Sequence, residues 1–132
     1  MLTVDLKNRI KRSGPLSFSD FVESCLYDLD EGFYTKRGSA GRRGDFLTSP
    51  EVGPFFGFLI ANWLDETWLK LNKPENFQVV EVGAGSGTLA RAIIDAQPHC
   101  LKNGVYTMVE RSQKLREEQP TSEKLVSATE SR

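Results

Sequence analysis

The spacing of apolar residues changes along this chain from a helical pattern to short continuous runs. Over about residues 52–71 apolar side chains recur every three or four positions, which predicts one long helix. Residues 79–82 are then apolar apart from Glu81, and residues 105–109 form a second short run. Runs of this length between turn residues are typical of buried parallel strands. Residues 88–96 have the spacing of a helix, so the order strand, helix, strand predicts an α/β fold.

This pattern divides the chain into three segments. Residues 1–74 are predicted to be helices and loops, with a short helix over 4–12 and an extended stretch over 33–35. Residues 75–120 contain the strand, helix and second strand, and the polar tail 121–132 is expected to fray. We therefore expect two strands in all, and we expect the tryptophans of the long helix in the core, namely Trp63 and Trp68.

A glycine-rich turn follows the first predicted strand. Its three glycines stand at alternate positions, and Glu81 precedes them by two residues; they are Gly83, Gly85 and Gly87. Glycines in this place make a tight turn, let the backbone come close to a ligand and lead into a helix. The pattern is typical of a nucleoside-cofactor site at the carboxyl end of a first strand. The alternative is a strand-to-helix turn that binds no ligand.

Three related motifs do not fit this turn. A dinucleotide fingerprint has its third glycine one position later, where this chain has Thr88. That spacing disfavours a nicotinamide-dinucleotide oxidoreductase. A phosphate-binding P-loop ends in Gly-Lys-Ser/Thr, and the pair here is Gly87-Thr88 without a lysine. A nucleophile elbow needs glycines two residues on either side of its serine, and Ser86 has Ala84 and Thr88 there.

An acidic residue, Glu110, ends the second predicted strand. A carboxylate at this place accepts hydrogen bonds from both hydroxyls of a bound ribose. Glu110 lies 27 positions after Gly83, slightly more than the about 20 of dinucleotide sites, and a loop around residues 97–103 accounts for the excess. The alternative is an ordinary solvated residue at a strand end. Together with the glycine turn, Glu110 favours a nucleoside site.

Composition and charge narrow the class of protein. The 132 residues are 39% hydrophobic and 27% charged, as in ordinary soluble domains. A net charge of −1 indicates neither nucleic acid nor an anionic membrane as partner, and no apolar run reaches the length of a membrane span. Cys25 and Cys100 lie far apart, which favours a reducing compartment. His99 has no further ligand set, so we expect no metal site.

Several blocks resemble the start of the MidA-type methyltransferases, the bacterial and mitochondrial family whose mitochondrial members help to assemble respiratory complex I. The matching blocks are Gly14-Pro15-Leu16-Ser17-Phe18 with Phe21, Gly32-Phe33-Tyr34, Gly44-Asp45-Phe46-Leu47-Thr48-Ser49-Pro50-Glu51, and the glycine turn. The resemblance covers about residues 6–119. It implies an N-terminal helical segment followed by the first βαβ part of a Rossmann-like class I methyltransferase fold, truncated because family members are much longer. Residues 75–120 would begin the S-adenosylmethionine-binding domain.

The resemblance also implies a cofactor and site residues. The cofactor is S-adenosylmethionine, and no catalytic residue is assigned. Carried over by position, Glu110 would hold the ribose, Glu81 would lie beneath the cofactor, and its methionine and ribose part would be lined by Gly83, Ala84, Gly85 and Gly87. A substrate-facing group would comprise Asp45, Thr48, Ser49, Pro50 and Glu51. Glu51 would orient an arginine acceptor; the alternative is a helix N-terminal charge favoured by the helix dipole.

Two functions remain open at this point. The first is an S-adenosylmethionine-dependent methyltransferase with a protein acceptor, namely arginine in the mitochondrial members of the family, or its cofactor-binding N-terminal fragment. The alternative is a noncatalytic assembly module that docks on a partner through a sheet edge and the helix carrying Trp63 and Trp68. Either implies a protein substrate or assembly partner, and the sheet edge would allow self-association. We expect a cytoplasmic location, or the mitochondrial matrix in a eukaryote, although the N-terminus shows no clear transit peptide.

Overall fold

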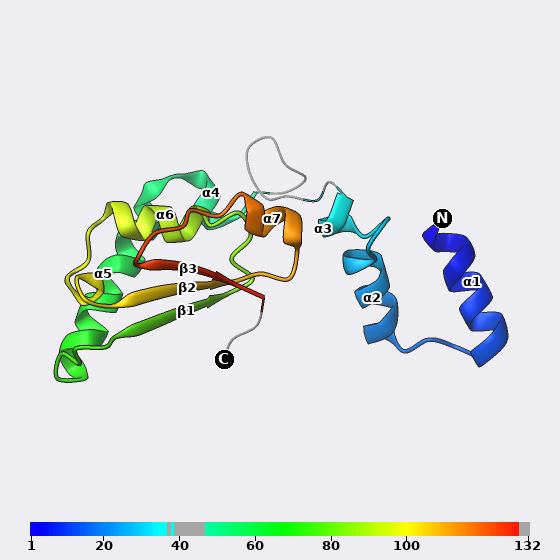
Figure 1. Cartoon of the computed structure of the whole chain (residues 1–132), viewed down its shortest axis with the longest axis horizontal. Helices are drawn as coiled ribbons and strands as arrows, with labels where there is room; N and C mark the ends of the chain where they lie inside the picture. Colours follow the sequence, from blue (N-terminus) through cyan, green and yellow to red (C-terminus); the bar gives the residue numbers. More distant parts are fainter. Residues whose placement is uncertain (37, 39–46, 130–132) are drawn as a thin grey trace. The chain divides into compact units, whose positions relative to one another are not determined.

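The computed structural model describes residues 1–36, 38 and 47–129, which form parts of two compact units, Met1–Gly38 and Ser39–Arg132 (Figure 1). The first unit contains α1 (Leu2–Ser13), α2 (Phe18–Tyr27) and α3 (Phe33–Lys36). The prediction of an extended stretch over 33–35 was wrong. The N–H groups of Thr35 and Lys36 both donate to the carbonyl of Gly32, which closes a helical turn.

The second unit contains the sheet and the helices that cover it. Its elements are α4 (Ser49–Val52), α5 (Pro54–Lys70), β1 (Gln78–Val82), α6 (Thr88–Asp95), the 3-10 turn η1 (His99–Leu101), β2 (Val105–Val109), α7 (Gln113–Glu117) and β3 (Leu125–Ala128). The predicted long helix and both predicted strands are confirmed. The compact units divide after Gly38, whereas the predicted segment boundary at 74–75 marks the start of the sheet and stays a prediction.

The sheet has the order β1-β2-β3, and both pairings are parallel. The third strand corrects two predictions, the count of two strands and the fraying of the tail. Its backbone pairs with β2, since the N–H of Tyr106 donates to Lys124 O at 2.8 Å and that of Glu110 to Ala128 O at 3.0 Å. Leu125 is buried against Tyr106, its register partner. Four residues with one buried side chain give too weak an apolar pattern to reveal the strand.

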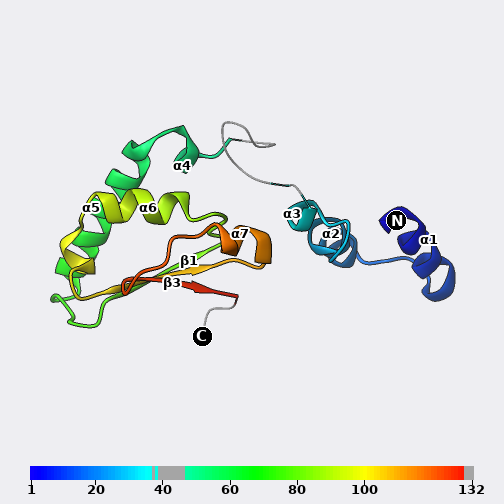
Figure 2. The same ribbon diagram turned by 45° about the horizontal axis from the view of Figure 1, so that its top comes forward.

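One face of the sheet is packed against α5 and α6, which lie together over it in Figure 2. The core joins side chains of both helices to those of β2 and β3, including Leu64, Ile93, Tyr106, Met108 and Leu125. Residues of the opposite face alternate with these along the strands. That face carries Val80, Val82 and Val126, which are exposed, Val82 by 76%.

The two tryptophans of α5 have different environments. Trp68 packs against the core as predicted, and its indole N–H donates to Pro74 O at 2.9 Å. Trp63 is 57% exposed, so its predicted core position was wrong. Apolar residues surround α5 on all sides, and only one side can face the sheet and α6. Within the residues that the structure describes, no helix has the length and apolar character to cross a membrane.

Candidate functional site

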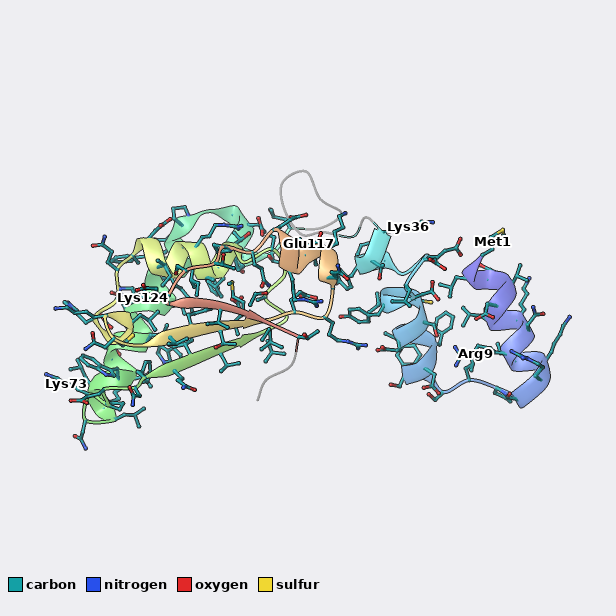
Figure 3. The ribbon with its side chains drawn as sticks, viewed as in Figure 1. Met1, Arg9, Lys36, Lys73, Glu117 and Lys124 are labelled. Atoms are coloured by element: carbon teal, nitrogen blue, oxygen red, sulfur yellow. The ribbon has the colours of Figure 1, made fainter. Side chains whose placement is uncertain are left out.

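The predicted site residues gather at the carboxyl ends of β1 and β2. Val82 and Val109 are register partners at the last position of each strand, so residues 83–87 and Glu110 leave the sheet at the same edge. Glu117, at the end of α7, lies at this edge, and Lys124 lies at the opposite edge, where β3 begins (Figure 3). Ligands of open α/β sheets bind outside the carboxyl ends of the strands.

Glu110 points at the glycine turn. One of its carboxylate oxygens accepts the N–H of Gly85 at 3.0 Å, and the other accepts the N–H of Ser112 at 2.8 Å. Only 7% of Glu110 is exposed. Its backbone is held as well, because the guanidinium of Arg116 donates to the carbonyls of Glu110 and Arg111, each at 2.6 Å. The acid and the turn, 25 residues apart in sequence, thus form one structural unit.

Gly83 and Gly85 face open space. Their φ angles are +77° and +55°, in the left-handed region that favours glycine. A Cβ atom added to either would meet no heavy atom within 4 Å. The turn is anchored from beneath, because the N–H groups of Gly83 and Ala84 donate to Val109 O at 2.8 and 3.1 Å. The structure therefore presents bare backbone on the side away from the sheet.

Gly87 and Ala84 have a different environment from the two open glycines. Gly87 is buried, and a Cβ atom there would lie 2.8 Å from the ring of Pro120 and 3.0 Å from the sulfur of Met108. Packing and its φ of +82° at the start of α6 therefore explain why this residue is glycine. Ala84 is buried in the core cluster. The cofactor contacts predicted for these two residues stay predictions.

Glu81 binds a tyrosine on the helix-covered side of the sheet. Its carboxylate accepts the hydroxyl of Tyr106 at 3.0 Å. Burial raises the pKa of Glu81, and the hydrogen bond from Tyr106 partly opposes that rise. Burial and the neighbouring Glu81 together raise the pKa of Tyr106 above its ordinary value. At neutral pH Tyr106 is therefore a neutral donor that holds Glu81 at the end of β1.

The predicted substrate-facing residues are only partly described. Asp45 lies outside the described residues. Thr48 precedes α4, and the helix itself begins with Ser49, Pro50 and Glu51, whose N–H donates to Thr48 O at 2.9 Å. Helix α4 contacts α6, the helix that begins after Gly87. The structure thus places these residues beside α6, and their predicted role toward substrate stays a prediction.

Sequence reasoning missed Gln119 and Ser127. The amide of Gln119 donates to Gly85 O at 2.8 Å and accepts from Ser127 Oγ at 2.6 Å. Gln119 directly precedes Pro120, whose ring packs against Gly87, and no local pattern in the sequence signalled its contact with the turn. Ser127 lies in the segment that was expected to fray.

These residues fit a nucleoside cofactor. A carboxylate has about four acceptor positions, of which the backbone N–H groups at Glu110 use two. Two acceptors therefore remain for a pair of neighbouring hydroxyls. The space beside Gly83 and Gly85 is where a ligand could approach the backbone. Across the described parts of the chain, no three His, Cys, Asp or Glu side chains converge as metal ligands.

A hollow lies at the amino ends of the strands, away from the glycine turn. It has a volume of about 360 Å³ and is lined by residues that follow α6, by η1 and by the start of β3, including Pro98, His99, Lys102 and Lys124. None of the predicted site residues lines it. The glycine turn and Glu110 are therefore the candidate site, and this hollow is separate from it.

Comparisons with known proteins agree with the geometry. A family model of S-adenosyl-L-methionine-dependent methyltransferases matches residues 59–126. The mitochondrial protein arginine methyltransferase NDUFAF7 homolog of Drosophila melanogaster is 36% identical over 107 residues, which are 81% of this chain and 24% of the fly protein. Human mitochondrial protein arginine methyltransferase NDUFAF7 is 37% identical over 117 residues, 85% of this chain and 26% of the human protein.

A solved structure shares the fold as well. It is the crystal structure of a COG1565 superfamily member from Burkholderia thailandensis bound to S-adenosyl-homocysteine, with a TM-score of 0.73 and 30% identity. The match covers 89% of this chain and 32% of that one, so the chain spans about a quarter to a third of the length of these relatives. Since the family model matches more than half of its residues, the chain belongs to the MidA-type family of S-adenosylmethionine-dependent methyltransferases.

Proposed function

We propose that this chain binds S-adenosylmethionine and forms the cofactor-binding front part of a methyltransferase. The observation that carries the proposal is the hydrogen bond of 3.0 Å from the Gly85 N–H to the Glu110 carboxylate. It joins the two halves of a nucleoside site at the carboxyl ends of adjacent parallel strands. The open space beside Gly83 and Gly85 supports the same function.

The relatives support the cofactor and suggest the acceptor. The Burkholderia protein was crystallised with S-adenosyl-homocysteine, the demethylated form of the cofactor. The fly and human relatives are named protein arginine methyltransferases, so we propose a protein arginine as methyl acceptor. Complex I assembly is then the process in which we expect the complete protein to act. We propose the mitochondrial matrix as its location in a eukaryote, since these relatives are named mitochondrial proteins, and the cytoplasm otherwise.

Each residue of the site has a physical role in this proposal. The bound cofactor supplies an electrophilic methyl group on a sulfonium. Glu110 accepts the ribose hydroxyls with its two remaining acceptor positions. Gly83 and Gly85 let the backbone approach the cofactor without side chains in between. Glu81 adds a carboxyl group at the end of β1, and its ionised form favours a positively charged cofactor.

For the acceptor, Glu51 is the residue that we propose to orient a guanidinium. A carboxylate can hold such a group with two parallel hydrogen bonds. Glu51 lies in the first turn of α4, where the helix dipole also favours an acid, so its charge has a second explanation. Replacing Glu51 with Gln would weaken binding of an arginine-containing peptide if Glu51 orients the guanidinium, and would leave it unchanged if Glu51 only interacts with the helix dipole.

Calorimetric titration with S-adenosyl-homocysteine tests the proposal. We expect micromolar binding to the chain and binding about tenfold weaker or worse for Glu110→Gln, which exchanges a charged acceptor for a neutral amide. Asp65→Asn is the matched control, because Asp65 also accepts two backbone N–H groups but lies away from the glycine turn. A folded chain that releases no heat with the ligand would refute the proposal.

A noncatalytic assembly module is the second candidate, and the surface of α5 favours it. Phe55, Phe58, Leu59 and Trp63 are exposed on this helix, Phe55 by 71%. Trp68 does not belong to this surface, because it packs on the core. A module of this kind would fold and show no cofactor binding. Self-association through the edge of β1 belongs to the same proposal, and sedimentation of the chain at several concentrations tests it.

A further inference from the structure

The side chain of Gln119 connects the glycine turn to β3. It is 7% exposed, its amide nitrogen donates to Gly85 O at 2.8 Å, and its amide oxygen accepts from Ser127 Oγ at 2.6 Å. A carbonyl oxygen can only accept, so the nitrogen of the amide must be the atom that faces Gly85. The hydroxyl of Ser127 then donates to the other end. The two contacts together allow one orientation of the amide.

Gly85 is thereby held at both of its backbone polar groups. Its N–H donates to Glu110 and its carbonyl accepts from Gln119. Its φ of +55° and the empty space around it leave no side-chain packing to orient it. The peptide group before Gly85 is held a second time, because Ala84 O accepts the N–H of Gly87 at 2.9 Å. The carbonyl of Gly85 itself is held by the Gln119 amide.

The residue after Gln119 acts on the same turn. The ring of Pro120 lies against Gly87, close enough that a Cβ atom there would be 2.8 Å from it. The chain leaving α7 thus contacts the turn at two points, by packing at Gly87 and by a hydrogen bond at Gly85. Packing alone would hold Gly87, and it would not set the direction of the Gly85 carbonyl. That direction is what the Gln119 amide adds.

We propose that Gln119, oriented by Ser127, is a positioning residue that preforms the open side of the glycine turn for the nucleoside part of the cofactor. This inference rests on the proposed function. Gln119 acts through Gly85 and touches no reacting atom. A turn that is already in its bound conformation binds more tightly, because ordering it costs nothing on binding. Through Ser127, the third strand becomes part of the cofactor site.

Titration of the whole chain with S-adenosyl-homocysteine tests the inference with two variants. Gln119→Leu removes both hydrogen bonds while keeping a side chain of similar size, and we expect binding about three- to tenfold weaker. Ser127→Ala frees the amide to turn and should weaken binding in the same direction by less. Asp65→Asn is the control, with a lower unfolding midpoint and unchanged affinity.

A third variant separates positioning from general stabilisation. In Gln119→Glu the ionised carboxylate cannot donate to Gly85 O, whereas the protonated acid can. Its affinity should therefore rise as the pH is lowered through the pKa of the new carboxyl group. Charged groups near this position include Glu110, on the N–H side of Gly85, and Arg91 of α6, whose guanidinium donates to Glu118 O at 2.6 Å, so the wild-type pH profile serves as the reference. A merely structural role would lower the unfolding midpoint without this pH dependence.

The outcomes distinguish this inference from the function on which it rests. If the wild-type chain binds and Gln119→Leu binds equally well, the positioning role is overturned and the proposed function stands. If Gln119→Glu shows the wild-type pH profile, the donor at this position is irrelevant and the inference fails again. If the folded wild-type chain does not bind S-adenosyl-homocysteine, the proposed function is refuted, and the inference with it.

Discussion

Two carboxylates at opposite ends of the sheet make the same pair of contacts. Glu110 accepts the N–H groups of Gly85 and Ser112 at 3.0 and 2.8 Å. Asp65, on α5, accepts those of His99 and Cys100 in η1 at 2.9 and 2.8 Å. Counted by hydrogen bonds alone, both sites look alike.

The backbone around the two carboxylates differs. Beside Glu110 lie Gly83 and Gly85, with positive φ and open space around them. Beside Asp65 lies the buried Cys100, and burial followed by the neighbouring Asp65 raises the pKa of its thiol to about 12. A thiol with such a pKa is unreactive at neutral pH. Asp65 therefore fixes α5 to η1, whereas Glu110 fixes a turn that can still receive a ligand.

The largest effect on the free energy of unfolding should come from a larger side chain at Gly87, the packed residue of the glycine turn. Gly87→Val places a branched side chain where Pro120 and Met108 leave no room, at a φ of +82°. Overpacking and left-handed strain together should lower the free energy of unfolding by about 2–5 kcal/mol. Urea denaturation followed by circular dichroism measures it. A change below about 0.5 kcal/mol, within the usual range of surface substitutions, would show that Gly87 is not a packing residue.

Removing the carboxylate of Glu110 should have the next largest effect. Glu110→Ala leaves the N–H groups of Gly85 and Ser112 without their acceptor in a buried place, which should cost about 2–3 kcal/mol. Asp65→Ala should cost less, about 1–2 kcal/mol, because Asp65 is only half-buried and water can replace it. Denaturation of both variants under the same conditions gives the ranking. The reverse ranking would contradict the burial on which the comparison depends.

The pH dependence of stability should reveal the contribution of the two hydrogen bonds that Asp65 accepts from His99 and Cys100. Burial alone would raise the pKa of Asp65, but the N–H groups of Cys100 and His99 lower it below its ordinary 3.8. A carboxyl group whose pKa is lower in the folded than in the unfolded state stabilises the protein at pH values above the unfolded-state pKa. This stabilisation is lost as the pH falls through the folded-state pKa. The stability difference between wild type and Asp65→Asn should therefore be constant from neutral pH to about 4 and shrink below it.

Thermal denaturation of both proteins across this range measures that difference. The two curves should converge at the acid end. A difference that grows as the pH falls would mean that folding raises the pKa of Asp65, and this would contradict the account.

The smallest effect should come from an added methyl group on the open side of the turn. Gly83→Ala meets no neighbouring atom, so only its φ of +77° opposes it, at a cost of about 1 kcal/mol. S-adenosyl-homocysteine should nevertheless bind more weakly, because the methyl group enters the space that we assign to the cofactor. Unchanged affinity in a calorimetric titration would place that space outside the site.

The sequence predicted those parts of the molecule whose structure follows from the residue pattern of one short stretch. The helix over 54–70, both strands and the meeting of Gly85 with Glu110 follow from local patterns and from the rule that parallel strands end at one edge. Strand β3 could not be predicted, because its stability comes from pairing with β2 and from the single buried Leu125. The contact of Gln119 with Ser127 depends on that strand and was missed with it.

The spacing of apolar residues also could not predict which side chains of α5 are exposed. The apolar spacing of α5 indicated a core helix, yet Trp63 faces solvent within the second unit while Trp68 packs against the core. A helix that is apolar on all sides does not reveal which side meets the sheet. Likewise, three glycines in one motif have two different causes, open backbone at Gly83 and Gly85 and close packing at Gly87.

Amide-resolved NMR of the chain during titration with S-adenosyl-homocysteine tests the central claim most directly. The backbone signals of Gly83, Gly85 and Glu110 should shift most. Those of His99 and Cys100, which donate to Asp65, should stay in place. Shifts centred on His99 and Cys100, or a folded chain whose signals do not move at all, would contradict the assignment of the cofactor to the glycine turn.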